Sequence, residues 1–114
     1  MSPIFAGNPT GSGGGGGTGL SAWVTKTAAY TVVNGDRILA DTSAGTWVLS
    51  CPLIPTAGFE FWVRDAKGSW QTNNLTINRN GKPVRGSAEN VLGDHNWQEL
   101  HFVYKDAITG WLVW

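Results

Sequence analysis

The chain begins with a segment that no hydrophobic core can include. Residues 7–19 are mostly glycine, with only Asn, Pro, Ser and Thr beside it. These side chains offer almost no apolar surface to bury, and such a composition is typical of a linker. The sequence therefore predicts an arm, residues 1–19, followed by a folded part, residues 20–114, whose length allows one domain.

A small apolar group precedes the glycine tract. Glycine loses more backbone freedom on ordering than any other residue, so a single conformation of the tract requires contacts that hold it. Glycine also lets a partner approach the backbone where any Cβ would clash. We therefore expect an extended anchoring arm that docks into a groove of a larger assembly. Its expected contacts are Pro3, Ile4, Phe5, Leu20 and Trp23.

After Leu20 the sequence consists of short runs rich in Val, Ile, Thr and aromatic residues, separated by turn residues at intervals of about 8–12 positions. No segment of useful length has helical periodicity. This pattern predicts an all-β fold, a small β-sandwich or barrel-like domain. The expected strands are residues 22–26, 30–33, 37–41, 46–50, 60–65, 75–79, 84–85, 99–104 and 111–114.

The dipeptide Asn80-Gly81 is the strongest hairpin signal in the chain. A type I′ turn needs two residues that tolerate positive φ, and Asn-Gly is favoured there. The sequence therefore predicts that residues 75–79 pair with residues 82–85.

The composition restricts the partners. Charged residues make up 14% of the chain and the formal net charge is zero, so no basic field attracts phosphate backbones. No apolar stretch approaches the length of a membrane span, and no secretory leader is visible. We expect neither nucleic-acid binding nor membrane insertion. The chain is also weakly charged and rich in tryptophan, which suggests that neighbouring proteins cover its surface.

The sequence shows no catalytic constellation. Cys51 is the single cysteine and lies in an apolar stretch, which favours a small buried hydrophobe. The histidines His95 and His101 lack a third convergent ligand or a nucleophile, although Glu99 and His101 would share a strand face and suit a surface ion pair. The glycines of residues 11–16 lack the strand and helix of a dinucleotide site. We expect no enzyme, no cofactor and no metal.

The seven tryptophans are the main ambiguity. Trp47, Trp62 and Trp111 lie within apolar runs, and we expect them in the core.

The other tryptophans are candidates for contacts at the surface. Trp23, Trp70 and Trp97 have polar neighbours in the sequence, and Trp114 is its last residue. Exposed indoles occur at protein interfaces and also stack against sugars, so Trp70, Trp97 and Trp114 are interface or glycan contacts. We favour a protein interface, because a sugar would not immobilise the glycine arm.

A series of motifs follows in fixed order through residues 30–111. They are YTVVNGDRILADTSAGTW (30–47), LSCP (49–52), TNNLTINRNG (72–81), GSAEN (86–90), FVY (102–104) and TGW (109–111). This series resembles a β-rich structural module of tailed-bacteriophage virion proteins, found in fibres, collars and other appendages. Two departures are Cys51, where a small alcohol or aliphatic residue is usual, and residues 97–101, which are more polar and aromatic.

The resemblance implies a virion structural protein made in the cytoplasm of a bacterial host. It implies a homo-oligomer, with a trimer favoured, bound to other virion structural proteins as a tail fibre, collar or tail-associated adaptor. Two alternatives remain. One is a capsid decoration or cement protein, and the other is a carbohydrate-binding module that recognises a host glycan during attachment.

Overall fold

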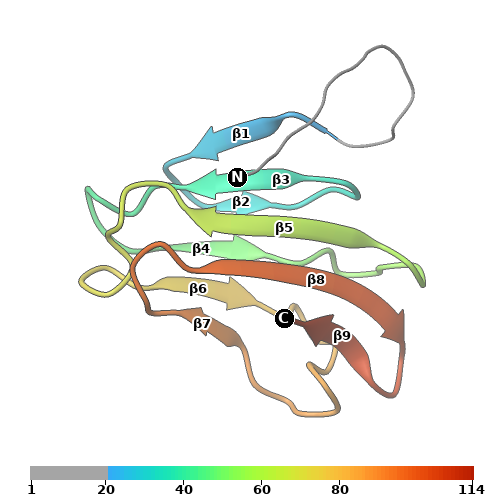
Figure 1. Cartoon of the computed structure of the whole chain (residues 1–114). Helices are drawn as coiled ribbons and strands as arrows, with labels where there is room; N and C mark the ends of the chain where they lie inside the picture. Colours follow the sequence, from blue (N-terminus) through green and yellow to red (C-terminus); the bar gives the residue numbers. More distant parts are fainter. Residues whose placement is uncertain (1–20) are drawn as a thin grey trace.

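Two β-sheets packed face to face make up the part of the chain that the computed structural model describes, residues 21–114 (Figure 1). This part contains strands and no helix, which confirms the prediction of a small all-β domain. The predicted arm contacts Pro3, Ile4, Phe5 and Leu20 lie outside the described residues. The strands are β1 (Trp23–Lys26), β2 (Tyr30–Thr31), β3 (Arg37–Ala40), β4 (Trp47–Ser50), β5 (Glu60–Asp65), β6 (Leu75–Asn78), β7 (Val91–Gly93), β8 (Glu99–Asp106) and β9 (Gly110–Val113).

The strand order arises because the chain passes from one sheet to the other between most consecutive strands. The larger sheet has the order β1-β3-β5-β8-β9, and the smaller one has the order β2-β4-β6-β7. Because successive strands up to β6 alternate between the sheets, neighbours within each sheet run parallel, as in β1–β3–β5 and β2–β4–β6. The later strands β7, β8 and β9 add antiparallel pairs.

The core lies between the sheets and is filled by the inward residues of each strand. In β5, Phe61, Val63 and Asp65 are buried whereas their neighbours are not. The ring of Phe61 stacks on Phe102 with centroids 4.6 Å apart, and both rings meet Trp111 edge-on. Each large apolar side chain buried in this way contributes about 1.5–3 kcal/mol. This two-layer core fixes which strand faces remain outside.

The sandwich has two ends that differ in their loops. Residues 41–46, 66–74 and 94–98 meet at the end on the left of Figure 1. Polar contacts join them: Thr42 and Ser69 share a hydrogen bond between their hydroxyls of 2.8 Å, and the backbone N–H of Gln71 donates to Asn96 Oδ1 at 2.9 Å. The opposite end carries the exposed apolar side chains Val33, Leu53, Ile54 and Ile108.

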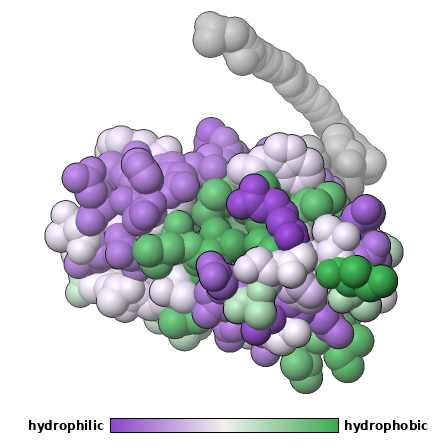
Figure 2. All heavy atoms as spheres, turned by 90° about the horizontal axis from the view of Figure 1, so that it is seen from below, coloured by the Kyte–Doolittle hydropathy of each residue, from purple (hydrophilic) through white to green (hydrophobic). Residues whose placement is uncertain are grey.

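The side of the molecule on which β7 and β9 lie is shown in Figure 2, where hydrophobic residues gather in the middle and at the lower right, and hydrophilic residues prevail on the left. Residues 84–92 line an open hollow of about 450 Å³ there. No group of three or more His, Cys, Asp or Glu side chains that could hold a metal ion occurs within residues 21–114.

Two of the strand predictions were wrong. Asn80 and Gly81 do have positive φ, 54° and 91°, as a tight turn requires. However, β6 pairs with β7 instead of residues 82–85, and Val84 forms only isolated bridges, to Ser87 and Trp111. The chain therefore leaves the sheet after the turn and returns as β7, which the sequence did not predict.

Residues 21–114 contain no helix long and apolar enough to cross a bilayer.

Candidate functional site

A row of aromatic and cationic side chains crosses the outer face of the five-stranded sheet. Strand register places Trp23 beside Arg37, Arg37 beside Trp62, and Trp62 beside His101. Trp114 completes the row, since its backbone exchanges two hydrogen bonds with His101, of 3.0 and 3.1 Å. We call these five residues the aromatic row. Each comes from a different strand or, for Trp114, from the residue after β9, so the row spans the full width of the sheet.

The side chains of the row are stacked against one another. The ring centroids of Trp62 and His101 are 4.5 Å apart at an interplanar angle of 5°, and those of His101 and Trp114 are 4.9 Å apart at 19°. The guanidinium of Arg37 lies 4.9 Å from the Trp23 ring centroid and 5.9 Å from that of Trp62. Contacts of this kind contribute about 0.5–1 kcal/mol each at exposed sites. The central rings, Trp62 and His101, thus lie between neighbouring side chains of the row.

Carboxylates and a second arginine flank the row. Glu60 Oε2 lies 2.5 Å from His101 Nε2, and Arg64 pairs with Glu99 at 3.2 Å. Glu99 and His101 do share a face as predicted, but each has its partner on β5. In these pairs each carboxylate lies beside a basic side chain, so this face of the sheet carries both charges and several polar groups.

Arg37 is incompletely satisfied within the described chain. Its Nη1 donates to the backbone oxygen of Ser21 at 3.3 Å, whereas its Nε is buried and has no hydrogen-bond partner among residues 21–114. A buried polar group without a partner costs stability, and such groups are rare in folded proteins. The row therefore contains a donor that an acceptor outside the described residues could satisfy.

The sequence prediction found the ends of the row and missed its middle. Trp23 and Trp114 were predicted as surface contacts, and both lie in the row. Trp62 was predicted in the core, which was wrong: Phe61 and Val63 face inward, so Trp62 faces outward. The alternation of Glu60, Trp62 and Arg64 was the signal that could have placed Trp62 on the outer face.

Trp70 was predicted as a surface contact, and this prediction was also wrong. Its side chain is fully buried, and its Nε1 donates to the backbone oxygen of Ala40 at 3.3 Å. Its backbone N–H donates to Asp65 Oδ2, which draws the residue inward from a polar loop. The polar residues next to Trp70 in the sequence therefore led to the wrong prediction. They form the turn, whereas the indole fills the space between the sheets.

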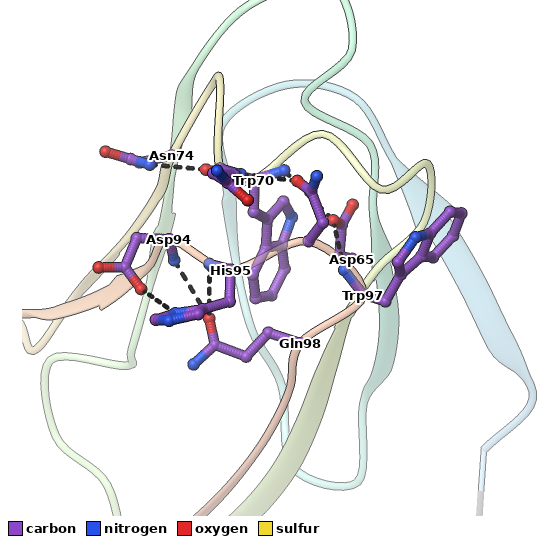
Figure 3. Close-up of polar contacts among 9 residues, drawn as sticks. Asp65, Trp70, Asn74, Asp94, His95, Trp97 and Gln98 are labelled. Atoms are coloured by element: carbon purple, nitrogen blue, oxygen red, sulfur yellow. Dashed lines mark hydrogen bonds and ion pairs between the residues drawn. The ribbon is translucent and has the colours of Figure 1, made fainter.

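Asp65 is the centre of the loops at this end of the sandwich (Figure 3). Its buried carboxylate accepts four backbone N–H groups: Oδ1 from Lys67 and Ser69, and Oδ2 from Trp70 and Trp97. Burial by itself raises the pKa of Asp65, but the four hydrogen bonds outweigh it and hold the pKa below its ordinary value. The carboxylate is therefore ionised and joins residues 66–74 to residues 94–98.

Trp97 is the exposed counterpart of Trp70. Its backbone has φ +64°, a left-handed conformation that costs a bulky residue about 1–3 kcal/mol. Its N–H donates to Asp65 at 2.9 Å, and its side chain is 70% exposed. A Cβ on Gly68 would overlap the Trp97 ring, so the indole rests on a residue that has none. Its role as an interface or glycan contact stays a prediction.

Within residues 21–114, Cys51 and His95 are not assembled into a catalytic group. Cys51 is fully buried, and burial raises the pKa of its thiol to about 12, so the thiol stays protonated. His95 contacts the neighbouring Asp94 at 2.7 Å in the exposed loop that precedes β8. Neither arrangement supplies a nucleophile with a base.

No protein-family model matches the sequence, and no curated protein matches it.

Proposed function

We propose that this chain is a structural protein of a tailed-bacteriophage particle. It is a tail fibre, collar or tail-associated adaptor that binds other virion proteins through residues 1–19 and the aromatic row. The series of motifs within residues 30–111 supports the phage class. The aromatic row supports the protein-binding role, and it is the single observation on which that part depends.

The geometry of the row suits a protein partner better than a sugar. A sugar ring stacks on an open aromatic face, but His101 is stacked between Trp62 and Trp114, and Trp62 lies between His101 and Arg37. Protein interfaces are enriched in Trp and Arg, which present both an apolar body and a polar edge. The unpartnered Nε of Arg37 adds a donor that a partner carbonyl would satisfy.

The arm and the row adjoin each other in the chain. Trp23 begins β1, which is the edge strand of the larger sheet, and the arm ends only a few residues earlier. A partner that holds the arm is therefore brought to the end of the row. Docking of Ile4 and Phe5 in a groove and burial of the row would then form one continuous interface in the particle.

Assembly of particles from defined variants tests this proposal. Deletion of residues 1–19 should leave a folded domain that no longer incorporates, and Trp62→Ala should reduce incorporation while the domain stays folded. Ile108→Ala, an exposed apolar change in the β8–β9 turn, serves as the control and should incorporate normally. Incorporation of the deletion variant at the wild-type level would overturn the proposal.

The copy number per particle locates the protein. A small number of copies indicates the tail or neck, whereas a number comparable with that of the capsid subunits indicates a decoration protein of the head. Sedimentation equilibrium of the purified chain tests the favoured trimer. Quantitative mass spectrometry of purified particles measures the copy number without any variant.

A further inference from the structure

We propose that the hollow lined by residues 84–92 is a groove that receives residues 3–5 of a neighbouring copy of this chain, so that the copies bind head to tail. The inference rests on the proposed docking of the arm and names its partner. The hollow has a volume of about 450 Å³, within the range of about 300–1,000 Å³ that ligand pockets have. It lies on the side of the sandwich that Figure 2 shows.

The lining of the hollow is held in place by hydrogen bonds within the domain. Val84 and Ser87 exchange two backbone hydrogen bonds, each of 2.8 Å, around a tight turn. The turn is attached to the larger sheet, since the backbone N–H of Arg85 donates to the backbone oxygen of Trp111 in β9 at 2.9 Å. The side-chain oxygen of Asn90 accepts a backbone N–H at 3.0 Å, which leaves its NH₂ group as a donor. The hollow is therefore formed without a partner.

The lining combines apolar side chains with polar groups of both kinds. Val84 is buried, whereas Leu92 is 48% exposed and offers an apolar contact. Arg85 and Glu89 are exposed, and neither forms an ion pair within the described part of the chain. An extended peptide suits this combination, because its backbone carries both donors and acceptors while its side chains need apolar contacts.

Other classes of ligand suit this lining less well. A sugar stacks on an aromatic ring, and no aromatic residue is among the described residues that line the hollow. A phosphate or carboxylate would be attracted by Arg85 but repelled by Glu89 in the same hollow. The lining therefore favours a short peptide without charged side chains.

The chain itself contains a peptide of this kind. Residues 1–6 include no charged side chain, and Ile4 and Phe5 are large and apolar. Residues 6–20 join this segment to the described part of the chain, and fifteen residues span at most about 50–55 Å. The segment is therefore long enough to contact a neighbouring domain.

The start of the described chain and the hollow lie at opposite edges of the sandwich. β1 is the first strand of the larger sheet, whereas β7 and β9 are the last strands of the two sheets (Figure 1). Within one molecule the arm would have to cross a sheet of five strands, about 19 Å wide, and its glycines have no side chains to hold it there. Between adjacent copies, β1 of one can lie beside the hollow of the next. Such head-to-tail contacts close into a ring when the rotation between copies allows it, as the favoured trimer requires.

Disulfide trapping between two variants of the full chain tests the contact in solution. Phe5→Cys supplies a thiol in the arm, and Leu92→Cys supplies one in the hollow. Cys51 does not interfere, because it is fully buried and burial raises the pKa of its thiol to about 12. In an equimolar mixture with oxidised glutathione, we expect mixed dimers to form about tenfold faster than either variant forms dimers alone. Non-reducing gel electrophoresis and mass spectrometry of the linked peptides measure these rates.

Val48→Cys is the matched control for Leu92→Cys. Val48 is also an exposed apolar residue in a strand of the smaller sheet, 40% exposed, but it does not line the hollow. Its mixture with Phe5→Cys should therefore form mixed dimers no faster than Phe5→Cys forms dimers alone.

A second measurement needs no disulfide. A carboxylate in the hollow would be buried against the apolar segment of the neighbouring copy. Leu92→Asp should therefore weaken the self-association of the chain about tenfold in sedimentation equilibrium. Val48→Asp, which places the same charge outside the hollow, should associate as the wild type does.

Three results would overturn this contact. One is a mixed-dimer rate for Leu92→Cys no higher than that for Val48→Cys. Another is equal self-association by Leu92→Asp and the wild type. The third is an intrachain disulfide in the chain that carries both Phe5→Cys and Leu92→Cys, without mixed dimers of the single variants, which would place the arm on its own domain.

The failure of this contact and the failure of the proposed function are distinguishable. If deletion of residues 1–19 abolishes incorporation into particles although no mixed dimers form, the arm binds another virion protein and only the present inference is overturned. If the deletion variant incorporates normally although mixed dimers do form, the copies bind head to tail and the assembly role of the arm is overturned.

Discussion

Trp70 and Trp97 are held by the same carboxylate oxygen and yet lie in opposite environments. Both backbone N–H groups donate to Asp65 Oδ2, at 3.2 and 2.9 Å. Trp70 is fully buried, and Trp97 is 70% exposed. Each ring also rests on a glycine, Trp70 on Gly93 at the end of β7 and Trp97 on Gly68 in the loop of residues 66–74.

The difference arises from the backbone and not from the sequence neighbourhood. Trp70 has an ordinary φ and directs its ring between the sheets, where Nε1 reaches the carbonyl of Ala40. Trp97 has φ +64° and directs its ring away from the core. Trp70 therefore stabilises the fold, whereas the side chain of Trp97 is held at the surface. Substitutions of these two residues should therefore differ in how much stability they cost.

The largest difference is expected between the two alanine variants. Trp70→Ala should lower the free energy of unfolding by about 3–5 kcal/mol, because it leaves a large cavity and removes a buried hydrogen bond. Trp97→Ala should change it by no more than about 1 kcal/mol, as for most surface substitutions. Urea unfolding followed by far-ultraviolet circular dichroism measures both.

The stability contrast would be refuted by equal losses in the two alanine variants. The free energy of unfolding of a small domain is only about 5–15 kcal/mol. Trp70→Phe therefore provides a second, milder test if Trp70→Ala does not fold. This variant keeps an aromatic ring and should lose about 1–3 kcal/mol, since the hydrogen bond to Ala40 and part of the packing are removed.

The carboxylate that joins the two loops should have the next largest effect. Asp65→Ala leaves four backbone N–H groups without their acceptor, and we expect a loss of about 2–4 kcal/mol in the free energy of unfolding. Asp106 offers a matched control, since it accepts the N–H groups of Ile108 and Thr109 in an exposed turn. Asp106→Ala should cost about 1 kcal/mol or less. A larger loss in Asp106→Ala than in Asp65→Ala would show that burial of the carboxylate is not decisive.

The contribution of Asp65 should also depend on pH. The folded state lowers the pKa of this carboxyl below its ordinary value. Its contribution is therefore fully present above the unfolded-state pKa of about 3.9 and is lost as the pH falls through the folded-state pKa. The stability difference between the wild type and Asp65→Asn should be constant above about pH 5 and shrink below about pH 4. A difference that grows on acidification would contradict the lowered pKa.

Substitutions of Gly93 and Gly68, the glycines under the two indoles, should differ in the same direction but by less in the free energy of unfolding. Gly93→Ala places a Cβ against the buried ring of Trp70, which has no room to move, and we expect a loss of about 1–3 kcal/mol. Gly68→Ala places a Cβ against the exposed ring of Trp97, which can swing into solvent, so its cost of about 1 kcal/mol arises from the φ of +65°. Thermal unfolding measures both, and a greater loss for Gly68→Ala would contradict the ordering.

Much of the fold could be predicted because local chemistry determined it. The alternating run of β5 was predicted with its observed bounds, Glu60–Asp65. The turns also depend on local contacts: the side chain of Asp36 accepts the N–H of Val33, and that of Asp41 accepts the N–H of Ser43. Such features depend on residues that are close in sequence, so a single chain displays them.

The candidate site could be predicted only in part, because it depends on register between distant strands. The aromatic row joins residues from β1 to β9, and nothing in the sequence states that Arg37 lies between Trp23 and Trp62. Likewise β7, only Val91–Gly93, has too few residues for a visible alternation. The failed pairing after Asn80-Gly81 has the same cause, since a turn motif fixes the turn and not the partner strand.

The smallest effect expected within the pair concerns the backbone of Trp97 itself. An alanine at this position retains the strain of the left-handed conformation, whereas a glycine does not. Glycine also loses more entropy on folding, which offsets part of the gain. Trp97→Gly should therefore be more stable than Trp97→Ala by up to about 1 kcal/mol, although it has the smaller side chain. Chemical denaturation of the two variants in parallel decides the point. If Trp97→Gly is the less stable of the two, the strain of this φ is smaller than the entropy that glycine loses on folding, and the backbone of Trp97 is not a costly feature of the fold.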